Sequence, residues 1–233
     1  MRTSLTMMVL ALAFPGDLLA ADIRAALMVY RVSEQGADPY ISRILVTPDH
    51  VRMDEGGAED AYTLFERSAG RLLNVDPEER SVLVLEPPAE IPESPLPLDI
   101  RERARPASAG PVDGVPALGW RLEANGRNCA EWDAVPGVME SATGAMADLN
   151  VQLARLHGRV LPEMPGEMLD VCDLARNVYA PGYAWLQGMP VTHEHGRMRL
   201  ELLDHEPALA VDASLFEVPG SYRRMEMPAP RAP

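Results

Sequence analysis

The sequence contains no lysine: all 21 basic residues are arginines, and 35 acidic residues bring the formal net charge to −14. Neutralising nucleic-acid phosphates requires clustered cations, so this balance argues against a nucleic-acid-binding protein. It also argues against docking on anionic lipid head groups by charge alone. We therefore expect no nucleic acid among the partners of this chain.

The sequence also lacks the short motifs of common enzymes. It has no G-x-S-x-G nucleophile elbow, no C-x-x-C redox pair and no glycine-rich phosphate loop. Acidic residues are many but scattered, and no two of them stand out as a hydrolytic acid and base. We therefore expect a protein that is not an enzyme and that uses no cofactor.

A long apolar run is found only near the N-terminus, at residues 5–14. A basic residue precedes this run, Pro15 and Gly16 interrupt it, and small residues follow, which is the layout of a cleavable signal peptide over residues 1–20. The run is shorter than the roughly 20 residues that span a bilayer. No cysteine follows the cleavage point, which argues against a lipid anchor. We expect an exported, periplasmic protein with no transmembrane segment.

The remaining chain predicts one domain over residues 21–225 and a disordered tail over 226–233. Its length suits a single domain, and a composition of 47% hydrophobic residues is sufficient for a full core. The first half alternates β-rich runs with polar turns, which predicts an antiparallel meander. The runs lie within 25–34, 40–56, 61–87 and 114–135, with a proline-dense loop at 87–100 and an Asn-Gly hairpin signal at 123–128.

The second half begins with helical character and then returns to strands. Apolar residues at helical spacing predict a helix over 138–160, and a second short helix is expected over 173–178. Strands are predicted again over 184–207 and 209–225. Together these patterns predict an α+β protein, in which a helical insertion at about 137–178 covers one face of a curved antiparallel sheet.

The sequence has two cysteines, Cys129 and Cys172. In an oxidising compartment, a lone pair of cysteines most simply forms a disulfide. Free buried thiols or a metal-binding thiol are the alternatives. We expect a disulfide with a structural role.

The stretch "VTHEHGRMRL" (191–200) has the pattern of a β-hairpin with two histidines one residue apart. The sequence fits two alternative turns, centred on Gly196-Arg197 or on His195-Gly196. The first pairs three sets of residues across the hairpin: His195 with Met198, Glu194 with Arg199, and His193 with Leu200. Both turns place His193 on the apolar face with Met198 and Leu200, and this set is our candidate ligand-binding surface.

Alternating histidines could also be two ligands of a copper or zinc ion, His193 and His195. A third ligand is needed. His205 lies five residues beyond Leu200, or roughly 17 Å along the strand, too far to share an ion with His193. His50 and His157 could approach only through tertiary structure. A periplasmic metal-binding protein is therefore an alternative hypothesis, and an ordinary hairpin is favoured.

Several stretches resemble a large family of exported bacterial proteins. "ISRILVTPDHVRMDEGG" (41–57), "RLLNVDPEERSVLVLEP" (71–87) and "LQGMPVTHEH" (186–195) resemble its strands, and "DASLFEVPGSYRRM" (212–225) resembles its closing pattern. In this chain the closing motif has glycine directly after proline, at Pro219-Gly220, which departs from the family pattern. The family is thought to share the half-barrel architecture of the LolA and LolB lipoprotein carriers.

The resemblance implies a strongly curved antiparallel half-barrel with helices lying across its concave face, and no catalytic residues. It suggests a cavity for an apolar ligand such as a lipid or a lipoprotein acyl chain. A fully packed core is the alternative, because methionine-rich helices can fill such a space. An accessory subunit that acts through protein partners is a third hypothesis for the function.

Overall fold

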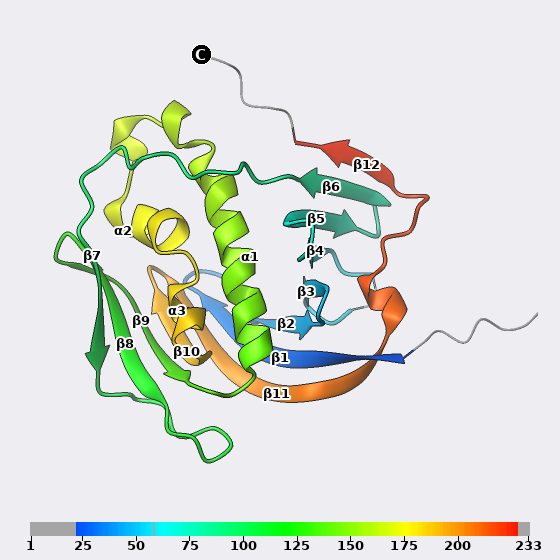
Figure 1. The fold of residues 1–233 in the computed structure, drawn as a ribbon, viewed down its shortest axis with the longest axis horizontal. Coiled ribbons are helices and arrows are strands. Elements are labelled where there is room, and N and C mark those ends of the chain that lie inside the picture. Colours follow the sequence, from blue (N-terminus) through cyan, green and yellow to red (C-terminus); the bar gives the residue numbers. More distant parts are fainter. Residues whose placement is uncertain (1–21, 58, 228–233) are drawn as a thin grey trace, which may run out of the picture.

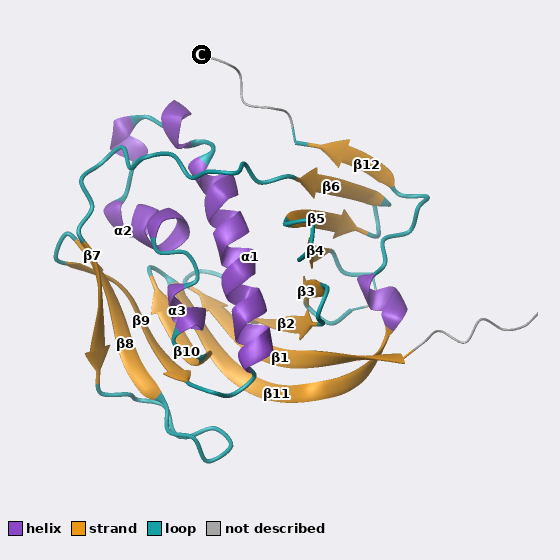
Figure 2. Cartoon of the chain, in the orientation of Figure 1, coloured by secondary structure: helices purple, strands orange, loops and turns teal. Residues whose placement is uncertain are grey.

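The computed structural model describes residues 22–57 and 59–227 of the 233-residue chain. The signal peptide predicted over 1–20 lies outside the described residues, and so do residues 228–233 of the predicted tail. The described residues form one open sheet of 12 mostly antiparallel strands, accompanied by a few helices (Figures 1 and 2). The predicted α+β class is confirmed.

Two antiparallel meanders build the sheet. The first contains β1 (Asp22–Glu34), β2 (Tyr40–Val46), β3 (His50–Asp54), β4 (Tyr62–Glu66), β5 (Arg71–Asp76) and β6 (Ser81–Leu85). The second contains β7 (Ile100–Arg105), β8 (Leu118–Ala124), β9 (Arg127–Val135), β10 (Met189–His195) and β11 (Met198–Asp212). Pairing between β1 and β11 joins the meanders. At one edge of the sheet β12 (Arg223–Glu226) pairs in parallel with β6, and β7 forms the other edge.

Some strands differ from those that the sequence predicts. The Asn125-Gly126 turn joins β8 to β9 as expected. The sequence does not predict β7, because IRERAR is mostly charged and lacks the pattern of a half-buried strand. Charged residues do suit a strand at the exposed edge of a sheet. β11 continues through Pro207, and β12 includes Glu226, the first residue of the predicted tail.

The helical insertion lies between β9 and β10, and the sheet bends around its main helix, α1 (Glu140–Gly158) (Figure 1). We call the face of the sheet next to α1 the inner face. Short helical turns follow: η1 (Leu161–Glu163), η2 (Gly166–Met168), α2 (Val171–Leu174), the π-helical η3 (Ala175–Tyr179) and α3 (Tyr183–Leu186). The strand predicted from residue 184 was wrong at its start, because residues 183–186 form α3.

The inner face carries a core shared between the sheet and α1. Alternate residues of β1, among them Met28 and Tyr30, pack with Met146 and Leu149 of α1, and all four are almost fully buried. The period of two along the strand and the spacing of three to four along the helix bring these side chains together. This packing fixes α1 across the middle of the sheet.

The outer face of the first meander has its own apolar core. Leu45, Leu64 and Val75 lie there, and Phe216 from η4 (Ala213–Phe216) covers them. The guanidinium group of Arg52 donates to the carbonyl oxygen of Leu215 at 2.6 Å and holds η4 in place. The "LFEVPGSY" stretch therefore closes this face of the sheet.

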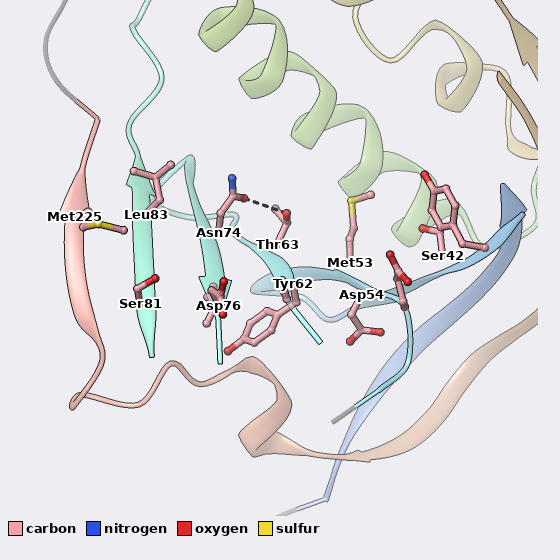
Figure 3. A pocket seen from close by; sticks show the side chains of 14 residues that line it. Ser42, Met53, Asp54, Tyr62, Thr63, Asn74, Asp76, Ser81, Leu83 and Met225 are labelled. Carbon is pink, nitrogen blue, oxygen red and sulfur yellow. Dashed lines mark hydrogen bonds between the residues drawn. The ribbon is translucent and has the colours of Figure 1, made fainter. Parts of the chain in front are cut away.

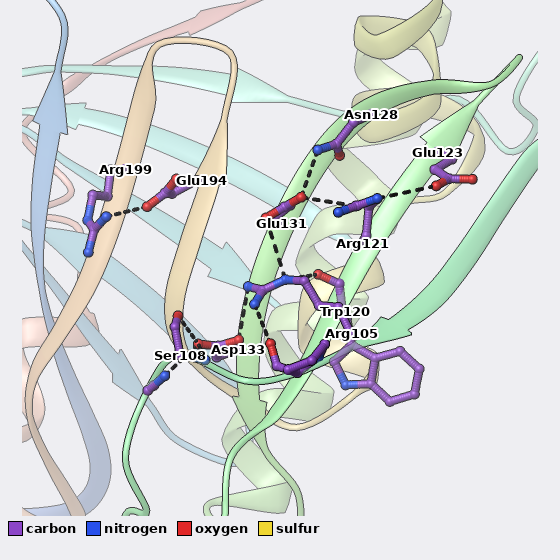
Figure 4. A network of polar contacts seen from close by, with 12 residues as sticks. Arg105, Ser108, Trp120, Arg121, Glu123, Asn128, Glu131, Asp133, Glu194 and Arg199 are labelled. Atoms are coloured by element: carbon purple, nitrogen blue, oxygen red, sulfur yellow. Dashed lines mark hydrogen bonds and ion pairs between the residues drawn. The ribbon is translucent and has the colours of Figure 1, made fainter.

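The outer face of the second meander is charged instead. Ion pairs link neighbouring strands across it, such as Arg103 to Glu123 at 2.9 Å. Figure 4 shows another, from Arg121 to Glu131 at 3.0 Å. These groups are partly exposed, so each pair contributes little to stability. Among the described residues, no apolar layer covers this face, so its charged groups are in contact with solvent.

One carboxylate on this outer face is fully buried. The Oδ2 atom of Asp133 accepts hydrogen bonds from Ser108 N, Ser108 Oγ and Ala109 N at 2.7–2.9 Å (Figure 4). Its Oδ1 atom lies 2.9 Å from Nη2 of Arg105. Asp133 therefore anchors the segment that follows β7 to strand β9.

The predicted disulfide is present. Cys129 and Cys172 are bonded, join positions 43 residues apart and connect β9 to α2. Leu122 pairs with Ala130 and Glu123 with Asn128, so Cys129 is an extra residue in β9. Such a bulge redirects a side chain, which explains how Cys129 reaches a helix on the inner side.

Candidate functional site

The histidine hairpin forms with Gly196-Arg197 as its turn. His195 pairs with Met198, Glu194 with Arg199, and His193 with Leu200, as the first of the two predicted registers requires. Glu194 and Arg199 make an ion pair on the outer face (Figure 4). His193 therefore lies on the inner, apolar face.

His193 is held by an aromatic group of the helical insertion. Its ring lies 5.4 Å from that of Tyr183 in α3, and its Nε2 atom lies 2.7 Å from the Tyr183 Oη atom. Burial raises the pKa of Tyr183, so the phenol stays protonated and donates its O–H to Nε2. Burial, and then the charges of His195 and Arg176, lower the pKa of His193 to about 3. His193 is thus a neutral acceptor that joins β10 to α3.

The other histidines do not complete a metal site with His193. His195 lies beside it, with ring centroids 4.9 Å apart, whereas His205 contacts Asp113 at 2.7 Å and His50 packs near Phe216. His157 of α1 lies 3.3 Å from a carboxylate oxygen of Asp173. Within the described part of the chain, no three His, Cys, Asp or Glu side chains are grouped so as to hold a metal ion. The geometry gives His193 a packing role.

The half-buried, neutral His193 predicts acid sensitivity. In the unfolded chain a histidine titrates near pH 6.5, whereas His193 in the folded protein binds a proton only near pH 3. Between these values the unfolded state binds more protons, so stability falls as the pH falls. From pH 7 to pH 5 this histidine should cost about 2 kcal/mol of the free energy of unfolding. His193→Gln, which cannot titrate, should lose correspondingly less in urea unfolding at the two pH values.

Tyr183→Phe is the matched control for this prediction, because it removes the hydroxyl group and leaves the titrating ring in place. It should be less stable at both pH values and should keep the acid sensitivity of the wild type. Identical pH dependence in the wild type and His193→Gln would contradict the assignment of the acid sensitivity to His193.

A groove of about 510 Å³ opens on the inner face of the first meander. The side chains of Met53, Leu83 and Met225 line it from β3, β6 and β12. These residues belong to one row that runs across the strands. Pairing aligns Met53 with Thr63, Thr63 with Asn74, Asn74 with Leu83, and Leu83 with Met225. One position on each of five adjacent strands therefore faces the same space.

The groove combines this apolar row with polar groups. The Thr63 hydroxyl donates to Oδ1 of Asn74 at 3.0 Å across the floor (Figure 3). In the same view, Met53, Thr63 and Asn74 project from one side of the strands, and Asp54 and Tyr62 from the other. The groove thus offers apolar contact together with hydrogen-bonding groups, as ligand sites usually do.

The candidate ligand residues from the sequence lie apart from this groove. His193 and Leu200 are packed between the sheet and the helices, and Met198 lines a separate hollow beside His195. Most groove residues lie in the stretches that carry the family resemblance, but those stretches do not mark them as ligand contacts. Strand register is the signal that could have found them, since it places alternate residues of β3 to β6 in one row.

The fold and the groove define an open-sheet α+β protein with a ligand-sized hollow on its inner face. No protein-family model matches the chain, and no curated protein sequence matches it. Among solved structures, the chain is similar to an uncharacterized conserved protein from Thermus thermophilus, with a TM-score of 0.44 and 9% sequence identity. That similarity covers 90% of this chain and 92% of the other.

Proposed function

We propose that this protein is an exported, non-enzymatic binder of an apolar ligand, such as a lipid or a lipoprotein acyl chain, held in the inner-face groove. The groove itself is the observation that carries the proposal. Its volume of about 510 Å³ falls within the range of small-molecule sites, roughly 300–1,000 Å³. Flexible methionines at two of its positions suit an irregular apolar chain.

The arrangement of the sheet and α1 supports a half-barrel carrier of the kind that the sequence resemblance suggests. Met28 and Tyr30 of β1 pack tightly against α1, whereas the inner face of β4 to β6 carries the less buried Thr63, Asn74 and Leu83. One part of the inner face is therefore a closed core and the other is available to a ligand. None of the helices in residues 22–57 and 59–227 has the length and apolar character needed to span a membrane.

Binding of a neutral apolar dye, N-phenyl-1-naphthylamine, tests the proposal. We expect fluorescence enhancement with a dissociation constant in the micromolar range. Asn74→Trp should weaken binding at least tenfold, because the exposed Asn74 stands in the row that forms the groove and a tryptophan would fill it.

Leu203→Trp is the matched control. Leu203 lies on β11, is 45% exposed and is not among the groove residues. This variant should bind the dye as the wild type does, and circular dichroism should show both variants folded. Failure of the wild type to bind, or equal binding by Asn74→Trp, would count against the groove as a ligand site. Native mass spectrometry after gentle purification should in addition show bound lipid.

A further inference from the structure

The groove has an uneven charge. Its lining contains the acidic residues Asp54, Glu55 and Asp76, and none of the described residues that line it is basic. A hollow lined by charges of one sign attracts ligands of the opposite sign. The question is which of these carboxylates act on the groove.

Asp54 is already neutralised on the other side of the sheet. Its two oxygens accept from Arg43 Nε at 2.7 Å and Arg52 Nε at 2.5 Å, and its side chain is fully buried. The guanidinium group of Arg52 stacks over the Tyr62 ring and donates to the Leu215 carbonyl, so it belongs to the outer face. Asp54 therefore contributes little charge to the groove.

Among the described residues, Glu55 and Asp76, unlike Asp54, are not paired with arginines. Glu55 is exposed at the end of β3, and Asp76 accepts a backbone hydrogen bond from Glu79 N at 2.9 Å. In the described part of the chain, no arginine lies within ion-pair distance of either carboxylate. Neither negative charge is therefore offset by a direct ion pair to a described arginine at the groove.

An aromatic ring also lines the groove. Tyr40 lines the groove, is 37% exposed and donates its O–H to Glu34 Oε1 at 3.3 Å. Burial, and then the negative charges of Glu34 and Glu55, raise the pKa of the Tyr40 phenol. An aromatic face combined with nearby carboxylates is a favourable environment for an ammonium group.

From this geometry we propose that the groove selects amphiphiles with a cationic head group, an alkyl or quaternary ammonium, over amphiphiles with a carboxylate or phosphate head group. The alkyl chain would lie along Met53, Leu83 and Met225, with the ammonium group near Glu55 and Asp76. This inference rests on the proposed function, because it requires that the groove bind an amphiphile.

Competition against N-phenyl-1-naphthylamine at low ionic strength tests the selectivity. The competitors share a 12-carbon chain: dodecyltrimethylammonium, laurate and the neutral dodecyl maltoside, each below its micelle concentration. We expect the ammonium compound to displace the dye at about a tenfold lower concentration than laurate, and 0.5 M salt to reduce the preference. Glu55→Gln combined with Asp76→Asn should reduce the preference to below threefold.

The net charge of −14 favours cations everywhere on this protein, so the control must change the net charge equally. Glu90→Gln combined with Glu167→Gln does so at two exposed positions away from the groove. This control should keep the tenfold preference. Equal loss in both double variants, or displacement by dodecyl maltoside with no preference between the charged compounds, would overturn the selectivity and leave the proposed function standing. A wild type that fails to bind the dye at all would overturn the proposed function and this inference with it.

Discussion

Replacing Asp133 by alanine should lower the free energy of unfolding by about 3–5 kcal/mol. The carboxylate is fully buried, and its removal takes an ion-pair partner from Arg105 and leaves three donors from Ser108 and Ala109 without their acceptor. A buried charge or donor that loses its partner cannot regain the hydrogen bonds that it would make with water. Urea unfolding at pH 7 measures the loss.

Glu123→Ala is the matched control, since Glu123 is a carboxylate on the same outer face that pairs with Arg103 in a partly exposed position. It should cost about 1 kcal/mol or less. A similar loss for the two variants would show that burial and the four contacts of Asp133 are not what makes it important.

The same contacts predict how Asp133 responds to acid. Burial disfavours its charged form, but the hydrogen bonds from Ser108 and Ala109 and the charge of Arg105 outweigh burial and hold the pKa of Asp133 below its usual range. The unfolded state then binds the proton first, so this contribution is complete above the ordinary aspartate pKa and is lost as the pH falls further. Asp133 therefore acts at a lower pH than His193, whose effect begins near pH 6.5.

Removal of the disulfide by replacing Cys129 and Cys172 with serine should cost about 2–5 kcal/mol. The bond closes a loop of 43 positions between β9 and α2, so its loss frees the unfolded chain more than the folded one. The helical insertion keeps other contacts, including Arg127 to Asp170 at 3.1 Å and Arg176 Nη1 to the Cys129 carbonyl at 3.2 Å. The double variant should therefore fold, at reduced stability.

Urea unfolding with and without dithiothreitol provides the measurement and its control. The reductant should lower the stability of the wild type toward that of the double serine variant and should leave the variant unchanged. A wild type and variant that unfold at the same urea concentration would show that the disulfide does not contribute to stability.

Local patterns were sufficient where neighbouring residues decide the structure. The hairpin at 193–200 formed in a predicted register because Gly196 suits the turn and because Glu194 opposite Arg199 leaves His193 on the apolar face. α1 lies within the predicted range of 138–160 because its apolar spacing is helical. The presence of only two cysteines in the sequence also predicted the disulfide between Cys129 and Cys172.

Local patterns failed where distant contacts decide. Residues 183–186 are rich in residues common in strands, yet they form α3, where Tyr183 packs against Trp132 with ring centroids 4.9 Å apart and bonds to His193. β7 is mostly charged and becomes a strand because β8 offers its free edge. In both cases the partner lies elsewhere in the sequence, and propensity alone carries no information about it.

The sequence by itself predicted the α+β class, the disulfide and the side of the sheet on which His193 lies, because each depends on residue type and short-range periodicity. Only the tertiary structure decided where the groove lies. Its row of residues comes from five strands whose alignment is set by pairing across the whole sheet. Tertiary structure also decided the charge of the groove, because Asp54, Glu55 and Asp76 look alike in the sequence and differ only in whether an arginine reaches them.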